Sequence, residues 1–310
     1  MQKEEIDSIW GNKGGYDTHC LVYSVTGRFD VRVCSERLFR TKIELAINNP
    51  TFKSAWADKS YFDLFFPDVR FPYTIIKNVA GIFYDHDYNM LSREKAKCIM
   101  SEFTQFIIKP SLDNGFGRGV KLISGRVDHD ALFSEYKSDF VIQKVLEQCE
   151  PFARLNPTSV NVLRVISLFF NGRVTPIMAA LRCGALGSVT DNYITPDGLG
   201  MFVIGVNEDG KLKDEAFHSC GKRITKAPNG VDFTGINIPN YEKIKELVTA
   251  VHSRMAHFGF VGFDIAIEKN GEPVVIEYNI KSPGVLYYQY VNGPLFGDRT
   301  EEIAQMIRNK

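Results

Sequence analysis

The sequence lacks the features that mark several common functional classes. It has 310 residues, in which Lys+Arg and Asp+Glu each number 37, so its formal net charge is zero. Proteins that bind nucleic acid over a broad surface carry an excess of positive charge, so this balance argues against a nucleic-acid partner. No apolar run approaches the roughly 18 residues of a membrane-spanning helix, and the first residues do not form a signal peptide.

Cysteine and histidine are sparse and scattered. The six cysteines form no CxxC pair and no zinc-type spacing, and the six histidines show no ligand spacing. Cysteines of this kind without a signal peptide are typical of a reduced, cytoplasmic protein. The GxSxG motif of many Ser–His–Asp hydrolases is missing, which argues against that class. What remains is an ordinary globular composition, with 44% hydrophobic and 24% charged residues.

The most informative stretch runs from Phe263 to Gly284. Its turn, Lys269–Glu272, contains Asn-Gly between two β-prone runs, and this pattern predicts a hairpin. Asp264 lies at the start of the hairpin and Glu277 at its end, so strand pairing brings them together, with Asn279 on the same face as Glu277. Carboxylate and amide oxygens suit Mg²⁺, and the alternative is an edge hairpin with solvated acids.

A second stretch combines a strand lysine with a glycine-rich loop. Phe106–Pro110 predicts a strand that contains Lys109, and the loop after it has glycine at every second position from 115 to 119. The backbone N–H groups of such a loop can face an anion. The spacing is neither the P-loop pattern nor a GxGxxG that opens a helix, and a glycine-rich hairpin loop without a ligand is the alternative.

Two further segments predict strands that carry chemistry. Phe140–Val145 is strongly β-prone, and Ser159–Phe170 is a long strand that Asn171-Gly172 turns back into Arg173–Arg182. Arg164 lies in the long strand between apolar neighbours. A buried arginine needs an anionic or planar partner, so this residue is a candidate for a functional site.

The rest of the chain predicts a mixture of helices and strands. We expect residues 1 to about 20 to be loosely held, because they are polar and contain three glycines. Helical periodicity or capping signals favour helices over 31–49, 92–103, 130–136, 240–257 and 301–307. Aromatic residues at 56–67 predict a short helix with Asp58 as its N-cap, and strands are expected at 73–76 and 81–84.

The order and spacing of these pieces resemble the ATP-grasp superfamily from about Phe106 to Pro283. The stretches LNPTSVNVLRV, RCGALGSVTDNY and IPNYEKI resemble its sugar-transfer-associated branch, which is found among bacterial cell-surface polysaccharide genes. The resemblance implies an α+β ATP-grasp fold, in which two α+β lobes with antiparallel sheets hold the nucleotide between them. The expected parts are a mostly helical N-terminal lobe (1–72), a lid subdomain (73–145) and a core subdomain with the metal site (146–310).

The resemblance also implies roles for individual residues. Lys109 and Arg164 would be catalytic, because both would offset charge on the transferring phosphoryl group. One or two Mg²⁺ ions would be held by Asp264, Glu277 and Asn279. The acceptor side would be lined by Arg182, Asp191, Asn192 and Lys281. ATP would be bound by Lys77, Lys109, Gly115, Gly117, Gly119, Gln143, Lys144, Val145, Glu150 (or Glu147) and Arg164. For Lys77, an exposed lysine at a strand end is the alternative.

The activity implied by the resemblance is an ATP-dependent ligation. A carboxylate would become an acyl phosphate and then join an amine, with the reaction belonging to bacterial capsule or lipopolysaccharide biosynthesis. The partners would be small molecules, namely a sugar carboxylate and an amine or amino acid. One alternative is a kinase that phosphorylates a sugar hydroxyl, for which Asp191 is the candidate base. Another is a nucleotide-binding protein without turnover. The oligomeric state stays open.

Overall fold

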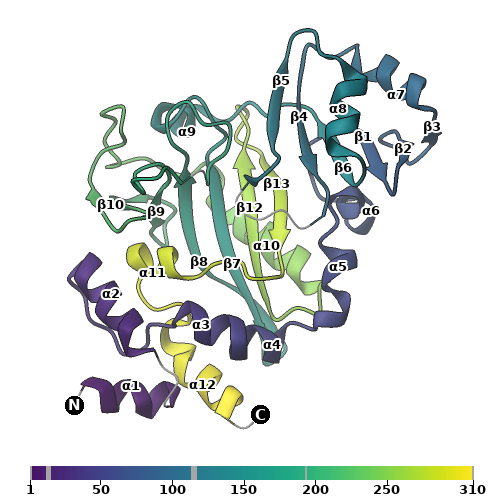
Figure 1. Cartoon of the computed structure of the whole chain (residues 1–310). Helices are drawn as coiled ribbons and strands as arrows, with labels where there is room; N and C mark the ends of the chain where they lie inside the picture. The colour runs from purple at the N-terminus through teal and green to yellow at the C-terminus, as the bar shows by residue number, and fades with distance from the viewer. Residues whose placement is uncertain (1, 12–14, 113–116, 193, 309–310) are drawn as a thin grey trace.

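The computed structural model describes residues 2–11, 15–112, 117–192 and 194–308. Two antiparallel sheets, each covered by helices, divide the chain between a smaller and a larger lobe (Figure 1). The α+β class with antiparallel sheets, predicted from the sequence, is therefore confirmed. In the part of the chain that the structure describes, no helix combines the length and the apolar character needed to cross a membrane.

The smaller lobe is built on a six-stranded sheet in the order β3-β2-β1-β6-β4-β5. Two helices, α7 (Arg93–Met100) and α8 (His129–Tyr136), begin at the side-chain caps Ser92 and Asp128. Both helices contribute to the apolar cluster of this lobe. The strands are β1 (Thr74–Val79), β2 (Ile82–Tyr84), β3 (Met90–Leu91), β4 (Gln105–Pro110), β5 (Lys121–Ser124) and β6 (Phe140–Gln143).

The larger lobe is built on a seven-stranded sheet in the order β11-β10-β9-β8-β7-β12-β13. Asn171 and Gly172 have positive φ angles of 50° and 74°, as a two-residue hairpin turn between β7 and β8 requires. The strands are β7 (Val162–Phe170), β8 (Arg173–Cys183), β9 (Phe202–Val206), β10 (Leu212–His218), β11 (Arg223–Ile224), β12 (Phe260–Ile267) and β13 (Pro273–Asn279).

Helices cover both faces of the larger sheet (Figure 1). On one face lie α5 (Lys53–Trp56), α6 (Phe62–Phe65), α9 (Glu150–Leu155) and α10 (Tyr241–Ser253). On the other lie α1 (Gln2–Trp10), α2 (Tyr16–Thr26), α3 (Glu36–Leu38), a π-helical turn (Phe39–Ile43), α4 (Glu44–Ile47), α11 (Leu286–Asn292) and α12 (Thr300–Arg308). Short 3₁₀ turns occupy Pro50–Phe52, Lys59–Tyr61 and Gly297–Arg299.

The beginning of the chain differs from the sequence expectation. Residues before position 20 were expected to be loosely held, but they form α1 and the first part of α2, with Ile6 and Trp10 buried. A helix in a protein is stabilised mainly by burial of one face, and α1 offers only Ile6, Ile9 and Trp10 as an apolar face within a polar segment. The helix expected over 31–49 begins at Glu36, because Ser35 caps it by accepting a hydrogen bond from Leu38 N.

The register of β7 and β12 places apolar side chains on one face of the larger sheet and charged side chains on the other. On β7 and β12, Leu163, Val165 and Phe263 pack in the apolar cluster that contains α10. Side chains of neighbouring positions point to the opposite face, so Arg164 and its paired residue Asp264 lie together on that face. This end of the sheet faces the smaller lobe, and the candidate site begins here.

Candidate active site

A buried ion-pair network lies at the centre of the site. Arg164 donates from Nε and Nη2 to the two carboxylate oxygens of Asp264, and Arg182 Nη2 donates to Asp264 Oδ2 at 3.1 Å. All three residues are at most 7% exposed. Burial raises the pKa of Asp264, but the charges of Arg164 and Arg182 outweigh that effect and hold it well below its usual range. Asp264 is therefore a permanent carboxylate.

Neighbouring groups fix the two arginines in place. Arg182 Nε donates to Asp191 Oδ2 at 2.7 Å, and its Nη1 donates to the hydroxyl of Tyr288 at 3.2 Å. Arg164 Nη1 donates to the carbonyl of Pro283 at 2.7 Å, and its guanidinium lies over the Tyr288 ring. Tyr288 thus contacts both guanidinium groups, which holds them in one orientation at the edge of the cavity.

The candidate metal ligands lie on paired positions of β12 and β13. Asp264 pairs with Glu277 and Gly262 with Asn279, as the hairpin predicts, and Asn279 Nδ2 donates to Asp264 Oδ2 at 3.1 Å. A register shift after this pair breaks the predicted alternation along β13, so that both Val275 and Tyr278 pack in the core while Glu277 is left partly exposed. The bulge therefore turns Glu277 toward the cavity.

The donors present fit a magnesium ion. Two carboxylates and an amide are hard oxygen ligands, and the described residues hold no group of three or more His, Cys, Asp or Glu that would form a closed metal cage. Mg²⁺ usually takes one or two carboxylates and completes its coordination with phosphate and water. Asp264 Oδ2 already accepts three hydrogen bonds, whereas Glu277 Oε2 lies 3.4 Å from Lys59 Nζ. Glu277 is thus the more accessible of the two carboxylates.

Two lysines from different segments reach the same place. Lys109 on β4 is 7% exposed, and Lys59 precedes α6 and pairs with Glu277. Burial lowers the pKa of Lys109 to about 8, an effect that the charge of Glu277 partly offsets and the charge of Lys59 strengthens. Two neighbouring ammonium groups repel each other, so a site that holds both beside carboxylates favours a further anion.

These groups line one cavity of about 810 Å³ between the two sheets, a size typical of ligand sites. The segment that joins the sheets, Lys144–Glu147, forms part of its wall. Lys144 N donates to Tyr73 O, but the backbone N–H groups of Val145 and Leu146 meet no acceptor among the described residues. Backbone groups of this kind are available to a planar ligand. Gln143 also lines the cavity, and its side-chain amide donates to Thr74 Oγ1 at 3.0 Å.

The glycine-rich loop approaches the acceptor side of the cavity. Gly117 has a φ of 65°, and a Cβ at this position would lie 2.6 Å from Asn192 Oδ1. Glycine is therefore required where this loop meets residues 190–192. Gly117, Asp191, Asn192 and Lys281 all line the cavity, whereas Gly119 does not, and its carbonyl accepts from the Tyr136 hydroxyl. Gly115 lies outside the described residues.

Besides Gly119, the predicted nucleotide-binding residues Lys77 and Glu150 lie outside the cavity lining. Lys77 on β1 is fully buried. Its Nζ lies 2.8 Å from Asp63 Oδ2 and 3.3 Å from the Tyr88 ring centroid. The side chain of Lys77 points away from the cavity, so Lys77 forms an internal ion pair with Asp63 instead of contacting a ligand there. Glu150 is exposed on α9 beside Arg154, whereas Glu147, the alternative, lines the cavity wall.

Some cavity residues escaped the sequence reasoning. Lys59, Arg118 and Tyr288 line the cavity, and so do Glu36 and Arg40 from the N-terminal segment. A signal for Lys59 exists, because a lysine inside the aromatic run WADKSYF is as costly to bury as Arg164 between Leu163 and Val165. Glu36 and Arg40 give no such signal, since acids and bases at helical spacing usually form a solvated face.

The sequence matches a family model described as "Sugar-transfer associated ATP-grasp" over residues 130–305, which is more than half of the chain. Among curated proteins, none matches it significantly. The family resemblance inferred from the sequence is therefore confirmed.

Several solved structures have a similar fold at low identity. D-alanyl-alanine synthetase A from Vibrio cholerae O1 biovar eltor is 13% identical, with 85% of this chain and 67% of that chain covered and a TM-score of 0.48. The biotin carboxylase domain of 2-oxoglutarate carboxylase from Hydrogenobacter thermophilus is 14% identical, with 81% and 45% covered and a TM-score of 0.49. N5-carboxyaminoimidazole ribonucleotide synthetase from Thermotoga maritima is 14% identical, with 94% and 62% covered and a TM-score of 0.46. The chain thus spans between about half and two thirds of their lengths, and likeness at this level carries no argument about activity.

Proposed function

The chain belongs to the sugar-transfer associated ATP-grasp family, and on that premise we propose that it is an ATP-dependent carboxylate–amine ligase. One observation carries the proposal. Lys59, Lys109, Arg164, Asp264 and Glu277 come from five segments of the chain and line one cavity between two sheets. Cations beside a pair of carboxylates are the arrangement that phosphoryl transfer uses, because the protein mainly positions the reactants and offsets charge.

Each part of the cavity has a role in this reaction. The backbone of Val145 and Leu146 binds the adenine edge, and Glu147 is placed for the ribose hydroxyls. Lys59 and Lys109 bind phosphate oxygens, since an ammonium group is a compact charge with several donors. Glu277 and one oxygen of Asp264, with Asn279, would hold Mg²⁺, which supplies charge neutralisation between the phosphates when bound. The loop that contains Gly117 excludes water.

The chemistry then follows in two steps. A carboxylate oxygen of the acceptor attacks the γ-phosphorus in line, the bond to the bridging oxygen breaks, and ADP leaves. Arg164 lies where it offsets the negative charge that develops on the transferring phosphoryl. The amine nitrogen then attacks the acyl carbon, phosphate leaves with the bonding electron pair, and the amine loses a proton to solvent. We propose a sugar carboxylate as the acceptor, in cytoplasmic polysaccharide biosynthesis, because the family is sugar-transfer associated.

The proposal is tested by ADP release from Mg-ATP in a screen of sugar acids against amino acids. With an active pair in hand, Glu277→Gln removes one candidate ligand and should lower turnover about a hundredfold. Glu150→Gln makes the same chemical change on exposed α9, outside the cavity, and should leave turnover unchanged. Unchanged turnover in Glu277→Gln would reject the metal assignment.

Product analysis separates the ligase from the kinase. Amide product with ADP supports the ligase, and phosphorylated sugar without amide supports the kinase. A kinase needs a base near the acceptor hydroxyl, and Asp191 is bound to Arg182 through Oδ2. No observation therefore favours the kinase over the ligase. A protein that binds Mg-ATP but releases no ADP with any acceptor pair would support binding without turnover.

A further inference from the structure

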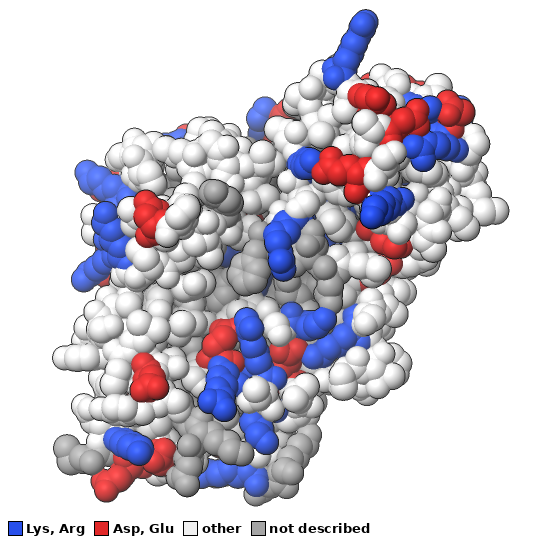
Figure 2. Space-filling model, viewed as in Figure 1, with Lys and Arg blue, Asp and Glu red and all other residues white. Residues whose placement is uncertain are grey.

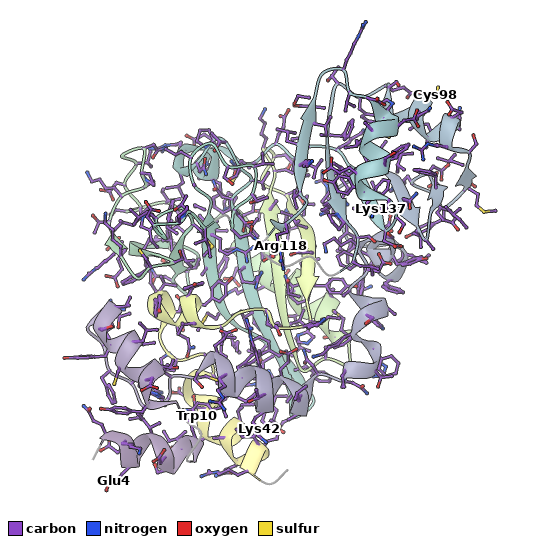
Figure 3. The ribbon with its side chains drawn as sticks, in the orientation of Figure 1. Glu4, Trp10, Lys42, Cys98, Arg118 and Lys137 are labelled. Carbon is purple, nitrogen blue, oxygen red and sulfur yellow. The ribbon has the colours of Figure 1, made fainter. Side chains whose placement is uncertain are left out.

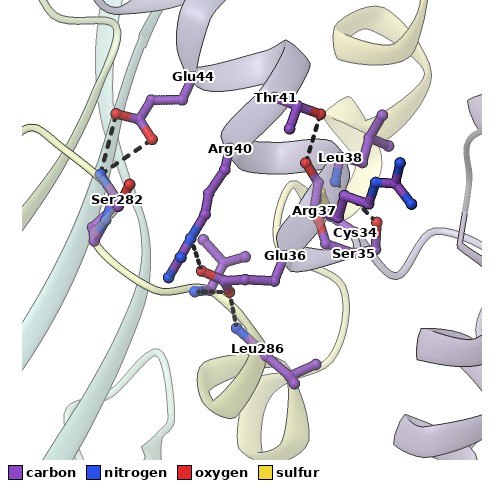
Figure 4. Close-up of polar contacts among 12 residues, drawn as sticks. Cys34, Ser35, Glu36, Arg37, Leu38, Arg40, Thr41, Glu44, Ser282 and Leu286 are labelled. Atoms are coloured by element: carbon purple, nitrogen blue, oxygen red, sulfur yellow. Dashed lines mark hydrogen bonds and ion pairs between the residues drawn. The ribbon is translucent and has the colours of Figure 1, made fainter.

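Two loops form walls of the cavity beyond the ion-pair network. The loop 281–286 is bonded to the N-terminal segment, over which Figure 2 shows Lys and Arg side chains gathered at α3 and α4. Glu36 Oε2 accepts from Leu286 N at 3.3 Å (Figure 4). Glu44 accepts from Ser282 N with both carboxylate oxygens at 3.1 Å. The second wall is the loop after β8, which we call the acceptor loop (residues 184–192).

The acceptor loop presents side chains to the cavity without regular secondary structure. The structure describes all of residues 184–192 and finds neither helix nor strand there. Asp191 and Asn192 line the cavity. The glycine-rich loop comes close to them, since a Cβ on Gly117 would lie 2.6 Å from Asn192 Oδ1, and Figure 3 places the neighbouring Arg118 between the two lobes. Side chains on an irregular loop need contacts from a rigid part of the protein to hold one arrangement.

Those contacts come from the turn between α9 and β7, which contains the sequence LNPTS. Asn156 is fully buried, and its Nδ2 donates to the carbonyls of Gly184 at 2.9 Å and Ala185 at 3.3 Å. Thr158 Oγ1 accepts from Gly187 N at 2.8 Å. Three backbone groups of the acceptor loop are thus bonded to two side chains of one turn.

The same turn is bonded to the nucleotide side of the cavity. Asn156 Oδ1 accepts from Thr158 N at 2.9 Å and from Thr158 Oγ1 at 2.8 Å. The Thr158 hydroxyl therefore acts as a donor to Asn156 and as an acceptor from Gly187, which fixes its orientation. Gln148 Nε2 donates to Asn156 O at 2.8 Å, and Gln148 follows Glu147 in the wall assigned to the nucleotide. The turn thus joins the nucleotide wall to the acceptor loop.

Two sequence stretches that carry the family resemblance meet at this junction. LNPTSVNVLRV contains the turn, and RCGALGSVTDNY contains the acceptor loop. Gly184 lies where they meet, and a Cβ at this position would lie 2.2 Å from Thr190 O and 3.1 Å from Ser159 Oγ. Only glycine permits the loop to fold back on its own base at this distance.

The inference rests on the proposed function. We infer that Asn156 and Thr158 are positioning residues for the acceptor, because they hold the acceptor loop against the nucleotide wall. Through this loop they orient the pair of Asp191 and Arg182 that lines the acceptor side. The Thr158 hydroxyl is occupied by contacts within the protein, so its loss should affect the acceptor and not ATP.

Kinetics of Thr158 variants test this inference with the active pair from the ADP-release screen. Thr158 is exposed, so Thr158→Val should fold while it loses the hydroxyl. Its KM for the sugar acid should rise about fivefold, because a hydrogen bond that orders the loop is lost, and its KM for ATP should not change. Thr158→Ser keeps Oγ and should restore the KM for the sugar acid. Thr249→Val removes a hydroxyl that donates to Lys245 O at 2.8 Å on α10, outside the cavity lining, and should change neither KM.

Hydrogen–deuterium exchange of the free proteins measures the loop directly. The amides of residues 184–192 should exchange faster in Thr158→Val than in wild type, Thr158→Ser or Thr249→Val. Circular dichroism and Mg-AMP-PNP affinity show that each variant is folded.

Each result decides the inference. Wild-type exchange of the acceptor loop in Thr158→Val, or an unchanged KM for the sugar acid, overturns it while the ligase stands. A KM for ATP that rises as much as that for the sugar acid overturns a role confined to the acceptor. Thr158→Ser that is as impaired as Thr158→Val overturns the role of the hydroxyl. Wild-type protein that releases no ADP with any pair overturns the proposed function, and the inference with it.

Discussion

Lys59 and Lys77 are two lysines with opposite surroundings. Lys59 lies in the cavity beside Glu277, with 14% of its side chain exposed, while Lys77 is completely buried against Asp63. Sequence reasoning chose Lys77 because it lies on a strand, as Lys109 does. A strand alternates its side chains between two faces, so a strand position alone does not show which face meets the ligand. The partners of a buried lysine come from distant segments, and no local pattern contains them.

The two lysines therefore predict separable effects of the same substitution. Lys59→Met should raise the KM for ATP at least tenfold with little change in Tm, because it removes a phosphate contact. Lys77→Met should leave the KM for ATP unchanged and destabilise the fold by about 2 kcal/mol, because Asp63 loses its cation. Steady-state kinetics and thermal unfolding on both proteins measure this. A raised KM for ATP in Lys77→Met, with an unchanged KM in Lys59→Met, would indicate that the ATP phosphates bind beside β1.

At the scale of elements, the hairpins and capped helices were predictable and the bulge was not. Asn-Gly turns and capping residues are local signals, so β7–β8, β12–β13 and α7 formed where expected. The bulge beside Glu277 allows both Val275 and Tyr278 to pack in the core. Strict alternation along the strand does not predict this shift in register. Helix α11 was missed, because it follows a Ser-Pro-Gly loop and buries aromatic residues rather than an aliphatic stripe.

The docking of α10 on β7 predicts a pH dependence of stability. His252 is fully buried, its Nε2–H donates to Phe258 O at 2.8 Å, and its Nδ1 accepts from the Ser167 hydroxyl at 2.7 Å. Burial lowers the pKa of His252 to about 4 from 6.5. Between these values the unfolded chain binds the proton and the folded protein does not, so stability should fall as pH drops from 6.5 to 4, by about 3 kcal/mol in all.

Urea unfolding at pH 7, 5.5 and 4.5 measures this dependence. His252→Gln should lose most of the slope that wild type shows in this window, although it is less stable at pH 7. Since carboxylates also titrate there, the relevant quantity is the difference between the two proteins. His257→Gln, an exposed histidine five residues later, is the control and should keep the wild-type slope. Equal slopes in wild type and His252→Gln would contradict a neutral, buried imidazole.

At the scale of the whole molecule, the two ends of the sequence form one structural unit. The N-terminal segment bonds to the loop after β13 through Glu36, Glu44 and Asn48, and α1 packs against α12 (Figure 1). The division of the chain at residues 72 and 145 remains a prediction, but the helices before residue 57 pack on the larger sheet. Sequence periodicity finds helices and cannot show what they cover, so the N-terminal wall of the cavity emerged only from the fold.

Asn48 tests whether this unit folds as one. Its side chain donates to Phe260 O and Ile280 O at 2.8 and 3.0 Å and accepts from Phe260 N at 2.8 Å, with 1% exposure. Asn48→Ala leaves three buried backbone groups unpaired and should destabilise the protein by about 3 kcal/mol, lowering Tm in a single transition. Asn49→Ala removes only an exposed cap on Thr51 N and should cost about 1 kcal/mol.

The Asn48→Ala substitution should also affect kinetics. Because residues 281–286 line the cavity, loss of the Asn48 hydrogen bonds should raise the KM of the acceptor more than that of ATP. A wild-type Tm in Asn48→Ala, or separate melting of the N-terminal segment, would show that this segment does not unfold cooperatively with the larger sheet.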